Sequence, residues 1–292
     1  MQFVKKVQIH KGWSNDKKYY VETEDQQKYL LRIYSSNKKE RCQHDFIMHQ
    51  KLTNLNIPIP TPISIGTCDE GTYILQSWID GNEARDVIKN FNSKQQYEYG
   101  IEAGKILKKI HSVCDNIRPK NLQIIYNQKI DNKIQNYNNC PLQYVNGYLF
   151  IEFIKKHRYL LNNCEYTFIH GDFHLGNMMI DNNNKLYIID FNRCSYGDPI
   201  NEFDRMVWNA KESPLFSTGL INGYFENNVP DYFWKLMALH ISLGTISSLP
   251  WAIDFHDEKE INTMVSMAQN VLNWYNNFNN IIPCWYINQP IL

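Results

Sequence analysis

Residues 170–177 read H-G-D-F-H-L-G-N, and residues 186–191 read L-Y-I-I-D-F. Asp172 precedes Asn177 by five residues, and Asp190 follows Asn177 by thirteen, at the end of an apolar run. The segments 166–169 and 185–189 are rich in β-branched and aromatic residues, which predicts two strands, and the cluster at 181–184 predicts a turn. A hairpin-like arrangement would bring the three polar side chains together. Carboxylate and amide oxygens are ligands that magnesium prefers.

Two other interpretations of this segment are weaker. Each aspartate alone could be an ordinary loop residue, but their joint spacing, followed by G-D-P at 197–199, disfavours that interpretation. A zinc site is also conceivable, because His170 and His174 lie four residues apart. That spacing ligates metal when it stands on a helix with a glutamate as general base. Gly171 and Gly176 indicate a loop instead, so we disfavour zinc.

The spacing is similar to the protein-kinase pattern H-R-D-x-x-x-x-N followed by D-F-G. The chain more closely resembles the aminoglycoside phosphotransferases and their relatives among choline, homoserine and fructosamine kinases. Their pattern is H-G-D-x-x-x-x-N, a hydrophobic strand ending in I-D-F/W/Y, and G-D-P with an acidic residue shortly after it. The resemblance extends over the whole chain and is most specific in the segment 170–204.

This resemblance implies an α+β, bilobal protein-kinase-like fold. A small antiparallel β-sheet would form an N-terminal nucleotide-binding lobe at residues 1–79, with a hinge near 76–80. A larger, mainly helical lobe at 80–292 would carry the catalytic and acceptor-binding residues. Helices are predicted by their apolar periodicity and are expected at 38–54, 95–111, 148–161, 201–209, 231–248 and 260–278.

The resemblance also implies roles for the residues of the motif. Asp172 would accept the proton of the acceptor hydroxyl, and Asn177 and Asp190 would hold Mg²⁺. Gly171 replaces the arginine of the protein-kinase pattern, and Asn192 stands where D-F-G has glycine.

Two further residues are expected to support the catalytic loop rather than take part in the chemistry. His170 opens the motif, and Glu202 aligns with the acidic residue after G-D-P, where relatives usually have aspartate. Asp204 is the alternative for this second role.

The first third of the chain would bind the nucleotide donor, ATP or GTP. The loop 11–17 resembles one that covers the nucleotide phosphates, which makes Ser14 and Asn15 candidates. Such loops bind phosphate through backbone N–H groups. Arg32 matches the family's phosphate-pairing cation, although an outward arginine on an edge strand remains an alternative.

Alignment places Asp45 as the acidic partner of this cation, with Glu40 as the alternative. The main chain of Ser77 and Ile79 would contact the base. Backbone recognition leaves the choice between ATP and GTP open.

Composition agrees with a folded enzyme. The chain has 292 residues, no net charge and 43% hydrophobic residues, which disfavours a disordered chain or a nucleic-acid binder. We find no run of about 18 apolar residues and no signal-like start, so no membrane association is expected. Seven scattered cysteines without a C-x-x-C pair suggest reduced thiols and a cytoplasmic location.

The charge distribution bears on the acceptor. Residues 195–292 contain ten acidic and four basic residues, a net charge of −6, which leaves +6 for residues 1–194. An acidic second segment suits a cationic small-molecule acceptor. The candidate carboxylates are Asp231, Asp254, Asp257 and Glu258. A solvated helix face is the alternative explanation for most of these acids.

The resemblance therefore implies transfer of a γ-phosphate to a hydroxyl of an aminoglycoside-type antibiotic or amino sugar. Five of the seven tryptophans follow residue 207, and aromatic rings can bind quaternary ammonium groups, so a choline-type acceptor stays open. A homoserine-type kinase and a non-catalytic nucleotide-binding pseudokinase are further alternatives. A protein kinase is disfavoured because the segment 191–199 is too short for a peptide-docking activation segment. A resistance role and a housekeeping role are both open.

Overall fold

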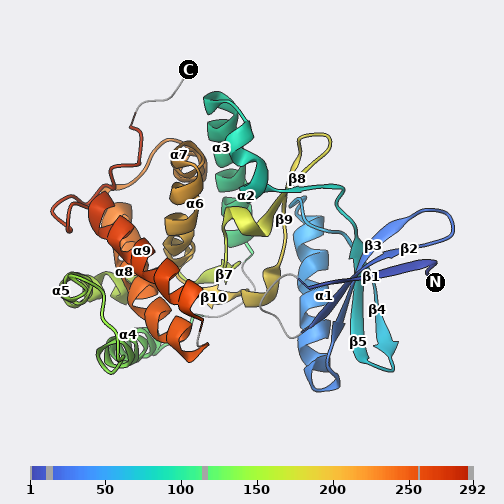
Figure 1. The fold of residues 1–292 in the computed structure, drawn as a ribbon, viewed down its shortest axis with the longest axis horizontal. Coiled ribbons are helices and arrows are strands. Elements are labelled where there is room, and N and C mark those ends of the chain that lie inside the picture. Colours follow the sequence, from blue (N-terminus) through green and yellow to red (C-terminus); the bar gives the residue numbers. More distant parts are fainter. Residues whose placement is uncertain (1, 11–15, 114–117, 256, 289–292) are drawn as a thin grey trace. The chain divides into compact units, whose positions relative to one another are not determined.

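The structure is a computed structural model that describes residues 2–10, 16–113, 118–255 and 257–288. Its contacts divide the chain into two compact units (Figure 1). Unit 1 comprises Met1–Val87 and Leu175–Arg193, and unit 2 comprises Ile88–His174 and Cys194–Leu292. This division differs from the expected boundary at residues 79 and 80, because the segment that carries Asn177 and Asp190 packs with the N-terminal part of the chain.

Unit 1 is built on a five-stranded antiparallel sheet with the strand order β1-β2-β3-β5-β4. The strands are β1 (Lys5–Ile9), β2 (Lys17–Glu22), β3 (Lys28–Tyr34), β4 (Pro62–Cys68) and β5 (Gly71–Ser77). Alternating apolar side chains of β2, β3 and β5 form a buried cluster of Val21, Leu31, Ile33 and Leu75 on one face. The predicted antiparallel N-terminal sheet is confirmed.

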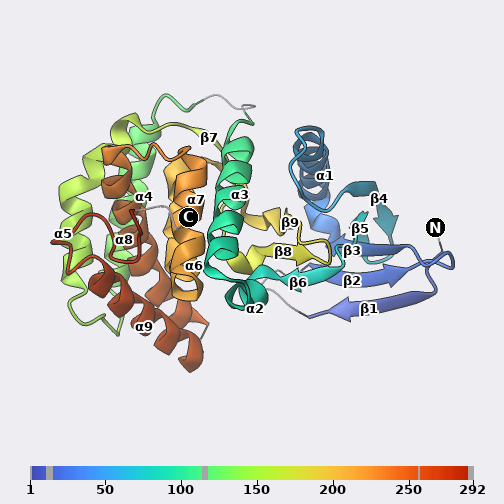
Figure 2. The same ribbon diagram turned by 90° about the horizontal axis from the view of Figure 1, so that it is seen from above.

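Helix α1 (Lys39–Asn54) lies beside this sheet in both ribbon views (Figures 1 and 2). It packs through Cys42 against Tyr34 and Ile74 of the neighbouring strands. The prolines that follow at 58, 60 and 62 cannot continue a helix, which explains why the chain returns to the sheet as β4.

A second, three-stranded antiparallel sheet of unit 1 has the order β6-β8-β9. Its strands are β6 (Gly81–Glu83), β8 (Met178–Asp181) and β9 (Leu186–Ile188), and the short helix α2 (Ala84–Val87) follows β6. The turn predicted at 181–184 is therefore a hairpin turn between β8 and β9.

This pairing corrects the expected hairpin between segments 166–169 and 185–189. The first of these segments, β7 (Thr167–Ile169), pairs instead with β10 (Ser195–Gly197) in unit 2. The physical reason is loop length, because a tight hairpin connects strands through two to five residues. Only β8, which the sequence analysis did not identify, is close enough to β9 along the chain.

Unit 2 is mainly helical. Its helices are α3 (Ser93–His111), α4 (Leu122–Asn138), α5 (Tyr148–His157), α6 (Met206–Glu212), α7 (Pro214–Tyr224), α8 (Asp231–Asp254) and α9 (Glu258–Trp274). Two of these were not predicted. Helix α4 is rich in Asn and Gln, and α7 is buried almost all round, so neither shows a clear apolar stripe. The helix expected at 201–209 is a 3₁₀ segment, Pro199–Arg205, followed by α6.

Helix α8 is long and apolar enough to cross a membrane by length and composition alone. However, 67% of its most apolar window is buried inside the protein, and the core helix of a soluble protein passes the same test. Polar residues such as His240, Ser242 and Thr245 interrupt the apolar sequence of α8, so no continuous apolar run of this length was expected.

Helices α3 and α7 run side by side in both ribbon views (Figures 1 and 2) and approach closely. Their contact is lined by four glycines at which an added Cβ would lie 2.2 Å from a carbonyl oxygen of the opposite helix. These glycines are Gly100, Gly104, Gly219 and Gly223. The small side chains therefore allow the two backbones to come together.

We predict that Gly104→Ala destabilises the protein by about 1–3 kcal/mol, because its Cβ would collide with the carbonyl oxygen of Leu220. Gly244→Ala is the matched control. Its Cβ would meet Asp204 Oδ2 at 3.4 Å, an ordinary contact, and alanine favours a helix by up to about 1 kcal/mol. Urea unfolding of both variants tests this, and equal midpoints would contradict it.

Candidate active site

The start of the H-G-D motif in unit 2 is held by one buried carboxylate. Glu202, 2% exposed, accepts hydrogen bonds from the backbone N–H groups of His170 (3.2 Å) and Gly171 (2.5 Å). Gly171 has a φ of +81°, a conformation that glycine adopts without strain. Glu202 thereby holds the backbone at the start of the motif.

Burial raises the pKa of the Glu202 carboxyl to about 8, and its two backbone hydrogen bonds oppose that rise. The 3₁₀ segment that carries Glu202 is itself fixed by Asp198. One oxygen of Asp198 accepts from the Ile200 N–H at 3.1 Å, and the other lies 2.7 Å from His240 Nε2 on α8. The supporting carboxylate therefore stands on a segment that is locked to the core helix.

Asp172 follows this anchored turn and is partly accessible, with 21% of its side chain exposed. Arg205 Nε lies 2.8 Å from Asp172 Oδ1, and His174 Nε2 lies 3.6 Å from the same oxygen. The His170 ring nitrogen Nδ1 accepts the Asp172 backbone N–H at 3.2 Å. The residue predicted to be the catalytic base is thus held in place from both its backbone and its side chain.

Sequence reasoning missed Arg205. Its Nη1 also lies 3.5 Å from Asp204 Oδ2, so the guanidinium joins two carboxylates. The pKa of Arg205 is raised, first of all by Asp204. Burial raises the pKa of Asp204 and lowers that of nearby Lys133 on α4. The only sequence signal for this cluster was the place of Asp204 and Arg205 just after Glu202.

The two candidate metal ligands lie in unit 1. Asn177 ends a 3₁₀ turn, Leu175–Asn177, and its carbonyl oxygen accepts the Ile189 N–H at 2.9 Å. That bond brings Asn177 next to Asp190 in space. Asp190 has a φ of +64°, an uncommon conformation that aspartate tolerates better than most residues.

The Asp190 carboxylate suits a cation. In the described part of the chain, its Oδ1 is buried without a hydrogen-bond partner, and its Oδ2 lies 3.4 Å from Lys18 Nζ. A buried oxygen without a donor is costly, and a hard cation such as Mg²⁺ would satisfy it. The donor set of Asn177 and Asp190 therefore fits the metal expected from the motif.

The chain passes from unit 2 to unit 1 between His174 and Leu175. Asp172 thus belongs to one unit, and Asn177 and Asp190 belong to the other. Along the chain only five residues separate Asp172 from Asn177.

Arg32 is 8% exposed on β3, where its burial disfavours the outward alternative. Its carboxylate partner is Asp16, which corrects the expected pairing with Asp45. Arg32 Nε donates to Asp16 Oδ2 at 3.2 Å, Nη2 also contacts that oxygen, and Lys38 Nζ lies 2.9 Å from Asp16 Oδ1.

Asp45 is buried elsewhere on α1. It accepts a hydrogen bond from the Tyr34 hydroxyl at 3.1 Å and pairs with Arg41 at 2.8 Å. The Arg32 guanidinium lies 4.7 Å from the Tyr34 ring centre, so the phenol stands between Arg32 and Asp45. Glu40, the alternative, is exposed at the start of α1.

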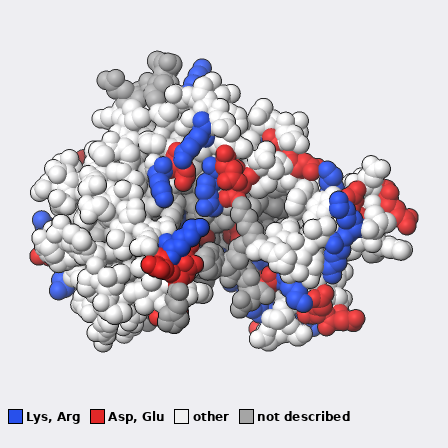
Figure 3. Space-filling model, viewed as in Figure 1, with Lys and Arg blue, Asp and Glu red and all other residues white. Residues whose placement is uncertain are grey.

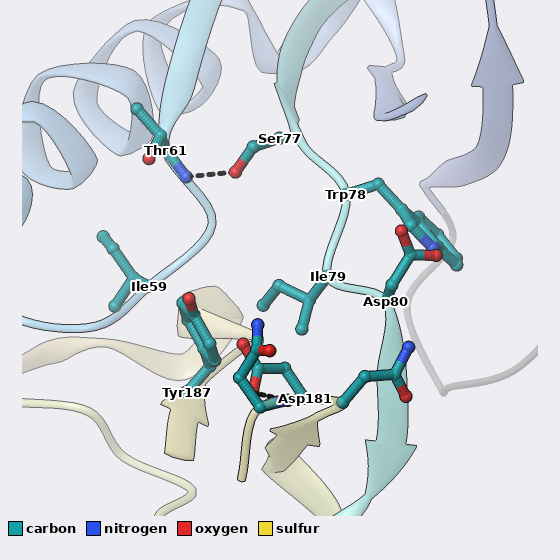
Figure 4. A pocket seen from close by; sticks show the side chains of 10 residues that line it. Ile59, Thr61, Ser77, Trp78, Ile79, Asp80, Asp181 and Tyr187 are labelled. Atoms are coloured by element: carbon teal, nitrogen blue, oxygen red, sulfur yellow. Dashed lines mark hydrogen bonds between the residues drawn. The ribbon is translucent and has the colours of Figure 1, made fainter. Parts of the chain in front are cut away.

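A pocket of about 370 Å³ opens beside the predicted hinge in unit 1 (Figure 4). Its walls come from the end of β5, the residues before β4 and the β8–β9 hairpin. They comprise Ile59, Thr61, Ser77, Trp78, Ile79, Asp80, Asp181, Asn182, Asn183 and Tyr187. Figure 4 shows the Ile79 side chain directed toward Ile59 and Tyr187. The apolar part of the lining consists of Ile59, Trp78, Ile79 and Tyr187, and the remaining lining residues are polar.

The main-chain contacts of Ser77 and Ile79 with the base stay a prediction, and the Ser77 N–H already donates to Thr61 O at 2.9 Å. The Trp78 N–H donates to Lys28 O of β3 at 3.3 Å. Ile79 follows the end of β5 and lines the pocket. The other predicted phosphate contacts, Ser14 and Asn15, lie outside the described residues.

Only part of the predicted acidic group comes together. Asp254 ends α8, and Asp257 and Glu258 begin α9, so these three lie near one another. Asp231 begins α8, about 35 Å away along that helix. Asp257 also caps α9 by accepting the N–H groups of Lys259 and Glu260 at 2.9 and 3.3 Å.

The tryptophans and the surface charges are also informative. Trp234 and Trp285 are 5% and 6% exposed and therefore belong to the core.

On the face shown in Figure 3, side chains of both signs lie next to one another. Lys28 Nζ and Asp80 Oδ1 lie 2.9 Å apart, so an acidic residue of the first sequence segment offsets a basic residue of the same segment.

Residues 6–234 match the model of a family described as the phosphotransferase enzyme family. The chain belongs to this family. None of the curated protein sequences matches the chain. The membership confirms the predicted resemblance.

Solved structures with the same kinase-like fold cover nearly the whole chain. A variant of aminoglycoside 2'-phosphotransferase-IIIa in complex with GDP is 13% identical, with a TM-score of 0.68 and coverage of 96% of this chain and 95% of that one. A thermostable aminoglycoside phosphotransferase APH(4)-Ia with AMP-PNP and hygromycin B is 13% identical, with a TM-score of 0.69 and 95% coverage of each chain.

A choline/ethanolamine kinase family protein from Mesorhizobium loti is similar to the same degree. It is 13% identical, with a TM-score of 0.66 and coverage of 94% of this chain and 90% of that one. At 13% sequence identity, the structural similarity establishes the bilobal kinase-like fold.

We predict that Glu202→Gln flattens the pH dependence of stability. The folded-state pKa of about 8 lies above the ordinary value of 4.5, so between these values the folded state holds a proton that the unfolded chain releases. The free energy of unfolding therefore falls as the pH rises across this range. Urea unfolding from pH 5 to 8 should show a shallower fall in the variant. Glu226→Gln, at a 73% exposed side chain, is the control, and equal slopes for Glu202→Gln and wild type would contradict the prediction.

Proposed function

We propose that the protein transfers the γ-phosphate of ATP or GTP to a hydroxyl of a small cationic acceptor, of aminoglycoside or amino-sugar type. The observation that carries this proposal is the position and exposure of Asp172. It is a partly exposed carboxylate on a loop anchored by Glu202, five residues before Asn177. A base for a hydroxyl must be accessible and oriented, and this aspartate meets both requirements.

Each unit would contribute its own part to the reaction. In unit 1, the hinge pocket would take the base of the nucleotide, and Arg32 would bind its phosphates. Asn177 and Asp190 would hold Mg²⁺, which would neutralise charge on those phosphates. In unit 2, Asp172 would orient the acceptor hydroxyl and take its proton, while Arg205 would fix the carboxylate. Such catalysis rests mainly on positioning and electrostatics.

Carboxylates of unit 2 support a cationic acceptor. Asp204 contacts Arg205, which also pairs with Asp172, and Asp254 and Glu258 are exposed at the junction of α8 and α9. The related structures named above include one bound to hygromycin B and one of the choline/ethanolamine kinase family. The second of these supports the alternative of a choline-, ethanolamine- or homoserine-type metabolite kinase.

We expect Asp172→Asn to lose at least about 100-fold in turnover, because an amide cannot accept the hydroxyl proton. Nucleotide affinity should change little, since Asp172 lies outside the hinge pocket. Phosphate transfer and nucleotide affinity are measured on the same protein, with Asp131→Asn at a 62% exposed side chain of unit 2 as the control. Normal turnover in Asp172→Asn would refute the assignment.

We also expect Mg²⁺-dependent nucleoside diphosphate release to be stimulated by a cationic acceptor. The panel contains aminoglycosides, amino sugars, choline, ethanolamine and homoserine, each with ATP and with GTP. Stimulation by aminoglycosides or amino sugars would support the proposal, and stimulation by choline, ethanolamine or homoserine would favour the metabolite kinase. Nucleotide binding without turnover on any acceptor would favour a pseudokinase.

A further inference from the structure

Lys18 brings a second cation to the Asp190 carboxylate, where the motif predicts a metal. Lys18 lies on β2 directly opposite Arg32 of β3, so both side chains project from neighbouring positions of the same sheet. Its Nζ lies 3.4 Å from Asp190 Oδ2, and only 16% of its side chain is exposed. Lysine is rarely buried to this degree unless it has a partner.

The adjacent residue shows that this placement is specific. Side chains alternate between the two faces of a strand, and Lys17 accordingly points elsewhere, pairing with Glu70 at 2.5 Å with 54% of its side chain exposed. Lys18 is the inward member of the pair. Arg32 cannot replace it at Asp190 without leaving Asp16, which it contacts through Nε and Nη2.

The carboxylate itself is poorly satisfied by this lysine. A separation of 3.4 Å is long for a charge-assisted hydrogen bond, which ordinarily spans about 2.7–2.9 Å. Asp190 Oδ1 is buried and accepts no hydrogen bond within the described ranges. An ion pair whose purpose was stability alone would satisfy both oxygens better. The long Lys18–Asp190 separation fits an ammonium group that can be displaced from the carboxylate.

We propose that Lys18 binds the phosphates of the nucleotide and, before the nucleotide arrives, serves as the counter-ion of Asp190. This inference rests on the proposed function. An ammonium ion and a divalent cation repel one another when they share one carboxylate. Metal binding to the nucleotide-free protein is therefore weakened. The nucleotide phosphates draw the flexible lysine away and carry the metal to the vacated carboxylate.

The variant Lys18→Met tests this because its two expected effects have opposite signs. Loss of the competing charge should raise the affinity of the nucleotide-free protein for Mn²⁺ by about tenfold or more. Loss of a phosphate contact should lower the affinity for ATP, measured without metal, by about tenfold or more. Electron paramagnetic resonance reports free Mn²⁺, and calorimetry reports ATP binding, so neither readout depends on turnover.

The controls separate this role from a merely structural one. Lys17→Met, on the outward face of the same strand, should leave both affinities unchanged, and Lys18→Arg should largely restore ATP binding. Thermal unfolding verifies that each variant is folded. Unchanged affinities in Lys18→Met, or a fall of both together, would overturn the inference.

The same experiment distinguishes failure of the proposed function. If the wild-type protein bound no nucleotide, the proposed function and the phosphate-binding role of Lys18 would fall together. A rise in Mn²⁺ affinity in Lys18→Met would then still establish the counter-ion role at Asp190.

Discussion

The buried carboxylate of Glu202 is the constraint on which the candidate catalytic loop depends. Without it, the buried N–H of His170 would lose its acceptor, at a cost of about 1–3 kcal/mol, and the partly buried N–H of Gly171 would lose one as well. Glu202 is placed by a segment that Asp198 and His240 lock to α8. The position of Asp172 therefore derives from the helical core of unit 2.

In unit 1, the residues expected to bind the nucleotide are held by ion pairs between side chains. Among the residues of unit 1 that the structure describes, two cations near the expected phosphate site already have a carboxylate, with Arg32 on Asp16 and Lys18 on Asp190. A nucleotide must compete with these partners. In return, the charged groups are already oriented and largely withdrawn from water, so less reorganisation is needed when phosphate replaces carboxylate.

Local structure was predictable where one local signal dominated. Strand β3 (Lys28–Tyr34) is an example, because its apolar and aromatic residues lie close together and favour a strand. Helix α3 has both an apolar stripe and a capping box formed by Asn92 and Gln95. Helix α7 gave no such signal, since it is buried on nearly every side and its glycines serve the contact with α3.

The sequence by itself determined the loop residues of the candidate site. Asp172, Asn177, Asp190 and Glu202 lie within about thirty residues of one another, and their spacing is a local property of the chain. Only the tertiary structure decided which charges pair. Asp16 rather than Asp45 meets Arg32, and Lys18 meets Asp190 from 172 residues away. Such pairs depend on strand register and on the packing of distant segments, which no local pattern encodes.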